Sequence, residues 1–256
     1  MSDGGDRPHA VYDEIGRGYA GRRVADPRIG GLIAAALGPA AHTPRVLNVG
    51  AGAGSYEPAD RRVVALEPSP VMLRQRPAGS APAVRGSAVA LPFADGCFDA
   101  TLASLTLHHW PDPLRGLAEM RRVSRRQVIF CFDPGHSHDE FWLLRDYVPQ
   151  IVALDARIHP SFREIEEVLG PLRVVPVPIP HDCSDGFLCA FWRRPEVYLD
   201  AATRRSISTF SMVDDVDEAM ERLRRDLADG SWARRNADLL ERESMDFGYR
   251  LLLAGD

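Results

Sequence analysis

The sequence predicts an α/β protein built on a doubly wound, mostly parallel β-sheet, and three observations support this prediction. Short apolar runs alternate with helical patterns through the first half of the chain, an order typical of a right-handed parallel sheet. The run Phe98–Leu105 is nearly all apolar, as expected of a strand covered on both faces. Two later apolar runs, Leu172–Ile179 and Gly186–Trp192, flank a short polar turn and predict a closing antiparallel hairpin.

The elements follow in chain order. A partly helical pattern runs over residues 10–24, and a clearer helix, Arg28–Leu37, begins after Asp26-Pro27 and ends at Gly38-Pro39. Strands are predicted at Arg45–Val49, Val63–Leu66, Ala83–Arg85, Phe98–Leu105 and Gln127–Phe132, with helices after Pro70, after Pro113 and over Ser161–Leu169.

The chain predicts one sheet domain with two helical additions. We expect residues 1–9 to form a disordered lead and residues 10–194 to form the sheet domain, with a helical insertion at 136–157. Residues 195–256 are expected to be a helical C-terminal extension packed on the same domain. A chain of 256 residues is long enough to bury a full core in this arrangement.

Composition excludes several classes of function. The formal net charge is −5, so there is no global basic field to hold nucleic acid. All 31 basic residues are arginine, which excludes a lysine Schiff base or lysine general base. The four cysteines are scattered and are interpreted as reduced thiols of a cytoplasmic protein. No signal peptide and no membrane-spanning stretch is recognised.

Two strand ends carry the pattern of a nucleoside-cofactor site. The strand ending at Val49 leads directly into Gly50, Gly52 and Gly54, and alternating glycines let the backbone turn sharply and approach a bound molecule closely. The next strand ends on Glu67, where a carboxylate can accept hydrogen bonds from both hydroxyls of a ribose.

The glycine spacing bears on which cofactor is bound. A dinucleotide fingerprint would place its third small residue at position 55, whereas here the third glycine is Gly54. The resulting Gly-x-Gly-x-Gly resembles motif I of the class I S-adenosylmethionine-dependent methyltransferases. Those enzymes usually carry an acid where this chain has Asn48. A nicotinamide-dependent oxidoreductase and a non-catalytic cofactor-binding protein remain alternatives.

Further segments resemble the type 11 branch of that family. Gly86–Asp99 is similar to the stretch that covers the adenine, and Ser104–Asp112 to the segment after the fourth strand. Tyr12–Ile15 and Tyr19–Arg22 are similar to the leader helix, and Arg121–Val123 to the end of a later helix. The resemblance implies a Rossmann-like, seven-stranded sheet ending in an antiparallel hairpin, with S-adenosylmethionine as cofactor.

The resemblance also implies the residues that hold the cofactor. Glu67 would take the ribose hydroxyls, the glycine loop would line the methionine part, and Tyr19 would close over the sulfonium. Either Arg22 or Arg23 would pair with the cofactor carboxylate. The full set implied is Tyr19, Arg22, Gly50, Ala51, Gly52, Glu67, Pro68, Met72, Ser87, Ala88, Ser104 and Leu105.

Candidate catalytic residues follow the fourth strand. His108 and His109 lie where the substrate should bind, and an imidazole can take the proton of a methyl acceptor. Tyr12, Trp142 and Tyr147 are candidates for the substrate pocket because aromatic walls suit a small organic acceptor. The His-x-His at residues 136–138 is too weak a pattern to predict a metal.

The sequence therefore predicts methyl transfer from S-adenosylmethionine to a small-molecule acceptor. Motifs of nucleic-acid methylation are absent, so neither DNA nor RNA is expected as substrate, and no membrane association is expected. The acceptor atom stays open between oxygen, nitrogen and carbon, and the protein is expected to be a monomer or a homodimer.

Overall fold

The computed structural model describes residue 21 and residues 23–255. The expected lead at 1–9, nearly all of the helix expected over 10–24, and the candidate residues Tyr12, Tyr19 and Arg22 lie outside the described residues. Among the residues described, no helix has the length and apolarity needed to cross a bilayer.

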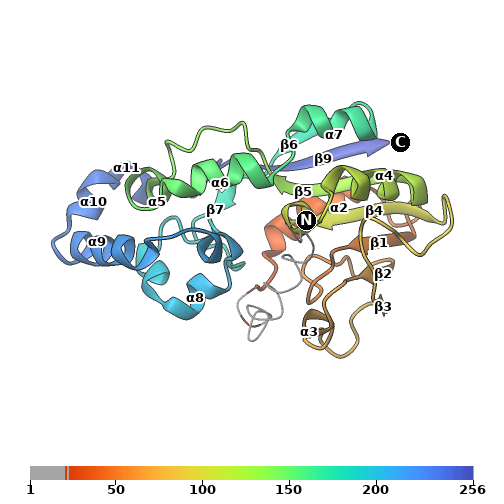
Figure 1. Ribbon diagram of the computed structural model, residues 1–256, viewed down its shortest axis with the longest axis horizontal. Coiled ribbons are helices and arrows are strands. Elements are labelled where there is room, and N and C mark those ends of the chain that lie inside the picture. The colour runs from red at the N-terminus through yellow and green to blue at the C-terminus, as the bar shows by residue number, and fades with distance from the viewer. Residues whose placement is uncertain (1–20, 22, 256) are drawn as a thin grey trace, which may run out of the picture.

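A seven-stranded sheet in the order β3-β2-β1-β4-β5-β9-β6 forms the centre of the molecule (Figure 1). Strands β3, β2, β1, β4 and β5 pair in parallel, and β9 is antiparallel to both β5 and β6. The strands of the sheet are β1 (Arg45–Val49), β2 (Arg62–Leu66), β3 (Ala83–Val84), β4 (Phe98–Ser104), β5 (Ser124–Phe132), β6 (Arg173–Pro176) and β9 (Tyr249–Gly255). Strands β7 (Ile179–Pro180) and β8 (Ser244–Met245) form a separate antiparallel pair.

The doubly wound α/β architecture, with its antiparallel end, is confirmed. The helices are α2 (Pro27–Leu37), α3 (Pro70–Leu73), α4 (Pro113–Val123), α5 (Trp142–Asp146), α6 (Gln150–Ile158), α7 (Phe162–Leu169), α8 (Ala201–Arg205), α9 (Val216–Ala228), α10 (Ser231–Arg235) and α11 (Ala237–Leu240), with 3₁₀ helices η1 (Leu107–His109), η2 (Pro195–Leu199) and η3 (Ser208–Met212). Figure 1 shows α5 and α8–α11 gathered at one end of the molecule, away from strands β1–β4.

The closing strand comes from a different part of the chain than the sequence predicts. The predicted strand Gly186–Trp192 is wrong, because these residues form turns, while Tyr249–Gly255 occupies the position between β5 and β6. The apolar side chains of Gly186–Trp192 are needed for the core, since Phe187 and Trp192 are buried there. An apolar run alone does not distinguish a strand from another buried segment. Residues 177–248, which we call the β6–β9 insertion, therefore lie between two strands of the sheet.

The helices begin where the sequence provides caps. Asp26 accepts a hydrogen bond from the backbone N–H of Arg28 at the start of α2, and Pro27 occupies the first helical position. Asp112 caps α4 in the same way, followed by Pro113. Ser161 and Glu164 form a reciprocal capping box at α7. These caps fix where α2, α4 and α7 begin.

Both faces of the sheet are buried, because alternate residues of each strand point into different layers. In β1, Val46 packs in the layer that contains Ile33 of α2 and the β6–β9 insertion. Its neighbour Leu47 packs in the layer that contains Leu117 of α4 and Ile165 of α7. The open ends of the parallel strands lie between these layers, and the site is found there.

Candidate active site

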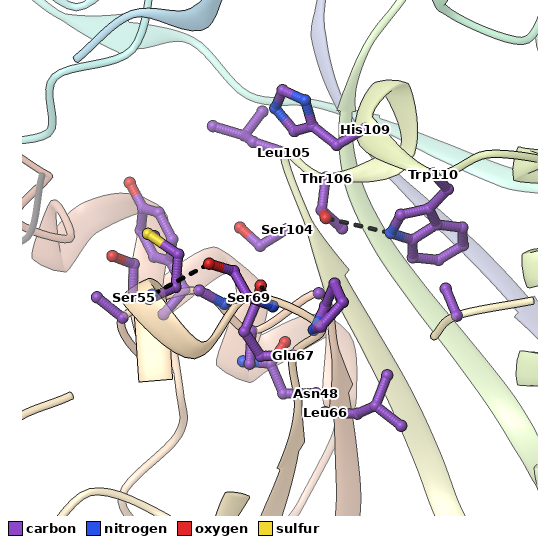
Figure 2. A pocket seen from close by; sticks show the side chains of 18 of the residues that line it. Asn48, Ser55, Leu66, Glu67, Ser69, Ser104, Leu105, Thr106, His109 and Trp110 are labelled. Carbon is purple, nitrogen blue, oxygen red and sulfur yellow. Dashed lines mark hydrogen bonds between the residues drawn. The ribbon is translucent and has the colours of Figure 1, made fainter. Parts of the chain in front are cut away.

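The first cavity lies at the carboxyl ends of β1, β2 and β4 (Figure 2). All the implied cofactor residues that the structure describes line it: Gly50, Ala51, Gly52, Glu67, Pro68, Met72, Ser87, Ala88, Ser104 and Leu105. The cavity is also lined by Asn48, Ser55, Tyr56, Ser69, Thr106, His109 and Trp110, which the sequence reasoning did not assign to the cofactor.

The glycine loop is held against the end of β2. The backbone N–H groups of Gly50 and Ala51 donate to the Leu66 carbonyl at 2.9 and 3.0 Å. Gly50 has a φ of 69°, and a Cβ at this position would lie 2.2 Å from the Thr106 hydroxyl oxygen. Only glycine meets both conditions, so the loop follows a path along the cavity floor that leaves backbone exposed to a ligand.

Glu67 links the glycine loop to the start of α3. Its side chain is 6% exposed, with one oxygen accepting from the Gly52 N–H at 2.8 Å and the other from the Ser69 N–H at 2.9 Å. A carboxylate can accept about four hydrogen bonds, so these two contacts fix its position and are compatible with bonds from a ribose.

Asn48 replaces the usual acid, and the structure brings a carboxylate to it from elsewhere. The Asn48 amide donates to one oxygen of Glu57 at 3.1 Å, and the other oxygen of Glu57 accepts from Arg76 at 2.8 Å. Both Glu57 and Arg76 are nearly buried, with side chains 10% and 6% exposed. At position 48, where the family usually carries an acid, this chain therefore has an amide that contacts the carboxylate of Glu57.

Leu105 lies between the first cavity and a second one. Its φ is 50°, an unusual value for a non-glycine residue that costs about 1–3 kcal/mol, and its N–H donates to the Phe130 carbonyl at 2.7 Å. Figure 2 shows Leu105 and His109 together on the side of the first cavity away from Asn48 and Leu66.

The second cavity shares Arg23, Leu105 and His109 with the first. Its walls are mainly apolar and aromatic, with Phe132, Phe141, Leu144, Phe187, Leu188, Phe247 and Tyr249 among the lining residues. Several of these come from the β6–β9 insertion, which therefore forms one wall of the cavity. The remaining polar groups include His108, His138, Asp155 and His159.

Arg23 is fixed where the two cavities meet. Its Nε donates to Asp185 at 2.7 Å, and the Tyr56 hydroxyl donates to the other oxygen of the same carboxylate at 2.9 Å. Asp185 is fully buried in the β6–β9 insertion, so the insertion also sets the position of the cation. Of the two arginines that the sequence proposes for the cofactor carboxylate, Arg23 is the one that the structure describes, and it lines the first cavity.

His108 and His109 lie on η1, where the second cavity begins. Their rings are in contact, with centroids 3.8 Å apart. Burial, His159 and Arg23 lower the pKa of His109 to about 3, and burial with the neighbouring His109 lowers the pKa of His108 well below its ordinary value. Both imidazoles are therefore neutral at neutral pH.

Trp142 and Tyr147 do not line either of these cavities, which corrects their assignment to the substrate pocket. Trp142 is fully buried and its Nε1 donates to the Trp192 carbonyl at 2.7 Å, while the Tyr147 hydroxyl donates to Asp226 at 2.5 Å. Their neighbours Phe141 and Leu144 face the second cavity instead. The aromatic run over 141–147 does lie beside a cavity. Which of its side chains face the cavity depends on their positions around the helix.

The described residues contain no cluster of three or more side chains placed to hold a metal ion. His138 and Asp155 lie near each other in the second cavity, but His136 points elsewhere and contacts Arg250. Sequence reasoning missed Asp155 and His159, because both are contributed by α6 and its end, far along the chain from the glycine loop, and no motif marks them.

Comparison with known proteins agrees with this geometry. The profile of the family described as a methyltransferase domain matches residues 47–132. A protein of known structure from Anabaena variabilis, assigned as a methyltransferase of an antibiotic biosynthesis pathway, is 30% identical with a TM-score of 0.81, covering 92% of this chain and 99% of its own.

Curated relatives match a shorter stretch. An uncharacterized methyltransferase of Mycobacterium sp. (strain JLS) is 43% identical over 86 residues, which is 31% of this chain and 34% of that protein. The demethylmenaquinone methyltransferase of Renibacterium salmoninarum is 44% identical over 89 residues, which is 32% of this chain and 37% of that protein. The matched region thus spans about a third of these relatives' length.

The Anabaena protein is matched over almost its whole length, so the match extends into the insertion that forms one wall of the second cavity. In this chain the glycine loop, Glu67 and the antiparallel strand between β5 and β6 belong to one continuous sheet domain. The chain belongs to the class I S-adenosylmethionine-dependent methyltransferases, in the type 11 branch.

Proposed function

We propose that the protein transfers a methyl group from S-adenosylmethionine to a small-molecule acceptor bound in the second cavity. The observation that carries the proposal is that the two cavities meet at Leu105, His109 and Arg23. A donor in the first cavity and an acceptor in the second would then face each other across these residues.

The residues of the first cavity fit the cofactor. A Cβ on Gly50 or Gly52 would lie within 3.3 Å of neighbouring side chains, so these positions keep the backbone accessible in a narrow space. Glu67 would accept from the ribose, and Ser87 and Ala88 would border the adenine. Arg23 would pair with the terminal carboxylate. The bound cofactor supplies an electrophilic methyl on a sulfonium.

The protein's contribution would be to bind and align the two reactants. Holding two reactants in the correct geometry can supply about 7–11 kcal/mol of the barrier in favourable cases. Leu105 and His109 would border the path of the methyl group, and the aromatic walls would exclude water from it. We propose His108 and His109 as residues that border the acceptor.

A small-molecule acceptor is supported by the chemistry of the second cavity. Its walls are mostly apolar, with a few polar groups among them, as is common for small-molecule sites. The Anabaena relative, whose match extends into the insertion, is assigned to antibiotic biosynthesis. The demethylmenaquinone methyltransferase matches only 32% of this chain, so it carries no argument about the acceptor.

The proposal is tested by incubating the purified protein with S-adenosylmethionine and a panel of small phenols, amines and carboxylic acids. Formation of S-adenosylhomocysteine together with a product heavier by one methyl group is the expected result. Hydride transfer to or from a nicotinamide cofactor, with no methylated product, would replace this function with that of an oxidoreductase.

A further inference from the structure

The second cavity contains a buried carboxylate that is only loosely partnered. The Asp155 side chain is 7% exposed, and its carboxylate oxygens lie 3.7 Å from His138 Nε2 and 3.8 Å from His159 Nε2. These distances are longer than a hydrogen bond. Hydrogen bonds at a catalytic site often tighten only when the substrate is bound, so the spacing indicates a group placed to respond to a ligand.

A second observation points the same way. His138 Nε2 is buried and has no hydrogen-bond partner among the described residues. A buried polar atom without a partner is unfavourable, and that cost is removed when a ligand supplies the missing bond. Asp155 and His138 thus form a polar corner in an otherwise apolar cavity, and they require a ligand with a hydrogen-bonding group.

The positions of the rings connect this corner to the methyl donor. The His159 ring contacts His108, with centroids 4.8 Å apart, and His108 in turn contacts His109, which lines both cavities. The Phe132 ring packs against both His138 and His159, with centroids 5.4 and 5.6 Å away. A flat acceptor in this space would lie against aromatic surfaces, with its polar group at the histidines.

We propose that the acceptor is a small aromatic compound with an ionisable hydroxyl, and that His159, positioned by Asp155, takes the hydroxyl proton. This inference rests on the proposed function. The proton passes to the unprotonated ring nitrogen of His159, and the acceptor oxygen forms a new O–CH₃ bond. The S–CH₃ bond breaks at the same time, and its electron pair stays on sulfur to give S-adenosylhomocysteine.

Three other titratable groups of the cavity, His109, Cys189 and Tyr249, are less suited to accept the proton. A base works best when its pKa lies near the working pH, and the pKa of His109, at about 3, is too low. Burial raises the pKa values of Cys189 and Tyr249 well above their ordinary ranges, so both stay protonated.

His159 differs from His108 and His109 because a carboxylate faces it. Burial lowers the pKa of His159, and Asp155 acts in the opposite direction, while the pKa values of His108 and His109 are lowered further by the neighbouring imidazoles and by Arg23. Asp155 is thus a positioning residue that keeps His159 a stronger base than His108 or His109.

The charges around the cavity favour a hydroxyl acceptor over a cationic amine. Arg23 lines the cavity, and the sulfonium of the bound cofactor would lie just beyond Leu105. A positively charged acceptor would face the sulfonium and the Arg23 guanidinium, which Asp185 pairs, with Asp155 as the opposing charge within the cavity. An oxygen that becomes an anion during the reaction is instead stabilised by the sulfonium that carries the methyl group.

Three probes of similar size test the acceptor class on the full-length protein. These are 4-methylphenol, which is neutral at about pH 8, 4-nitrophenol, which is largely ionised there, and benzylamine, which is cationic. Both phenols should be O-methylated, and benzylamine should not. Methylation of benzylamine alone, or of none of the probes while S-adenosylhomocysteine still binds by calorimetry, overturns the acceptor class. Failure to bind S-adenosylhomocysteine instead removes the proposed function.

His159→Gln separates proton transfer from binding, because 4-nitrophenol has already lost its proton. The variant should lower kcat/KM for 4-methylphenol by about 100-fold and change that for 4-nitrophenol by less than about threefold. His42→Gln, at an exposed histidine outside the cavity, should alter neither. An equal loss on both phenols overturns the role of His159 as base.

Asp155→Asn tests the positioning role through pH. In the wild type, kcat/KM for 4-methylphenol should fall at acidic pH as His159 becomes protonated, and because burial lowers the His159 pKa, this acidic limb should lie below the ordinary imidazole value of about 6.5. Removal of the carboxylate lowers the His159 pKa further, so the acidic limb should move to lower pH while the plateau rate falls. Besides Asp155, the titratable and charged groups that share the cavity with His159 are Arg23, His108, His109, His138, Cys189 and Tyr249. An acidic limb that lies at the same pH in Asp155→Asn as in the wild type contradicts the coupling between Asp155 and His159.

Discussion

At the scale of single residues, the first cavity depends on a few positions where no other side chain fits. Gly50 combines a positive φ with a Thr106 hydroxyl that occupies the place of any Cβ. Glu67 fixes the same loop from the opposite strand end through the Gly52 N–H. Because each residue acts through the backbone of the loop, its replacement is expected to affect loop position as well as ligand contact.

Gly50→Ala should destabilise the protein by at least about 2 kcal/mol, since the methyl group adds a clash to an unfavourable φ. Gly79→Ala is the matched control, because Gly79 also has a positive φ, of 86°, but the methyl group of an alanine there would meet no neighbouring atom within 4 Å. The control should lose only about 1 kcal/mol. Urea denaturation measures both, and equal losses would show that contact with Thr106 is unimportant.

At the scale of elements, Asp26 joins the start of α2 to the β6–β9 insertion. The fully buried carboxylate accepts from the Arg28 guanidinium at 2.7 Å and from the Ser184 N–H at 3.1 Å. The Arg28 contact holds the pKa of Asp26 well below its usual range. The folded state therefore favours the ionised form, and the unfolded state binds the proton more readily.

This pKa difference gives a pH dependence of known sign. The stabilisation by Asp26 is complete above the ordinary carboxyl pKa of about 4 and decreases as the pH falls below that value. Asp26→Asn keeps a capping side chain but loses the charge, so it should cost about 1.5–3 kcal/mol at pH 7. In denaturation experiments, the difference in free energy of unfolding between wild type and variant should become smaller toward about pH 3. A difference that grows on acidification would contradict the assigned sign of the pH dependence.

Elements with local signals could be predicted from the sequence, whereas elements fixed by distant pairing could not. Strand β1 with its glycine loop and helix α4 with its Asp112-Pro113 start are encoded by adjacent residues. Strand β9 follows a long helical segment, and its position depends on pairing with β5 and β6 far earlier in the chain. Nothing in the residues 249–255 themselves specifies that pairing.

The same distinction applies to the site. The first cavity is built from strand ends and the loops directly after them, so short motifs were sufficient to find its residues. The second cavity is assembled from separate segments, including the end of β5, α6, the 187–189 turn and the start of β9. No local spacing joins Asp155 to His109, and only the folded chain brings them to one cavity.

At the scale of the whole molecule, β9 connects the sheet to the end of the insertion. It pairs along its length with β5 on one side and with β6 on the other, and it follows closely after Phe247 of the second cavity. A segment that completes the sheet therefore also holds one wall of the second cavity, so the stability of the fold and the geometry of this cavity are linked.

The position of β9 predicts unequal effects at two adjacent leucines. Leu252 is fully buried, so Leu252→Ala should destabilise the protein by about 2–5 kcal/mol. Leu253 is half-buried on the opposite face, and Leu253→Ala should cost less. Urea denaturation compares them, and a larger loss at Leu253 would contradict the observed register of the strand.

The central claim, that the first cavity is an S-adenosylmethionine site anchored by Glu67, is tested most directly by calorimetric titration with S-adenosylhomocysteine, NAD and NADP. S-adenosylhomocysteine should bind, and Glu67→Ala should weaken it by about 10- to 100-fold, as expected from the loss of hydrogen bonds to a charged group. Glu140→Ala, at an exposed position, should bind as the wild type does. Binding of NAD or NADP in place of S-adenosylhomocysteine, or an affinity that Glu67→Ala leaves unchanged, would contradict the account.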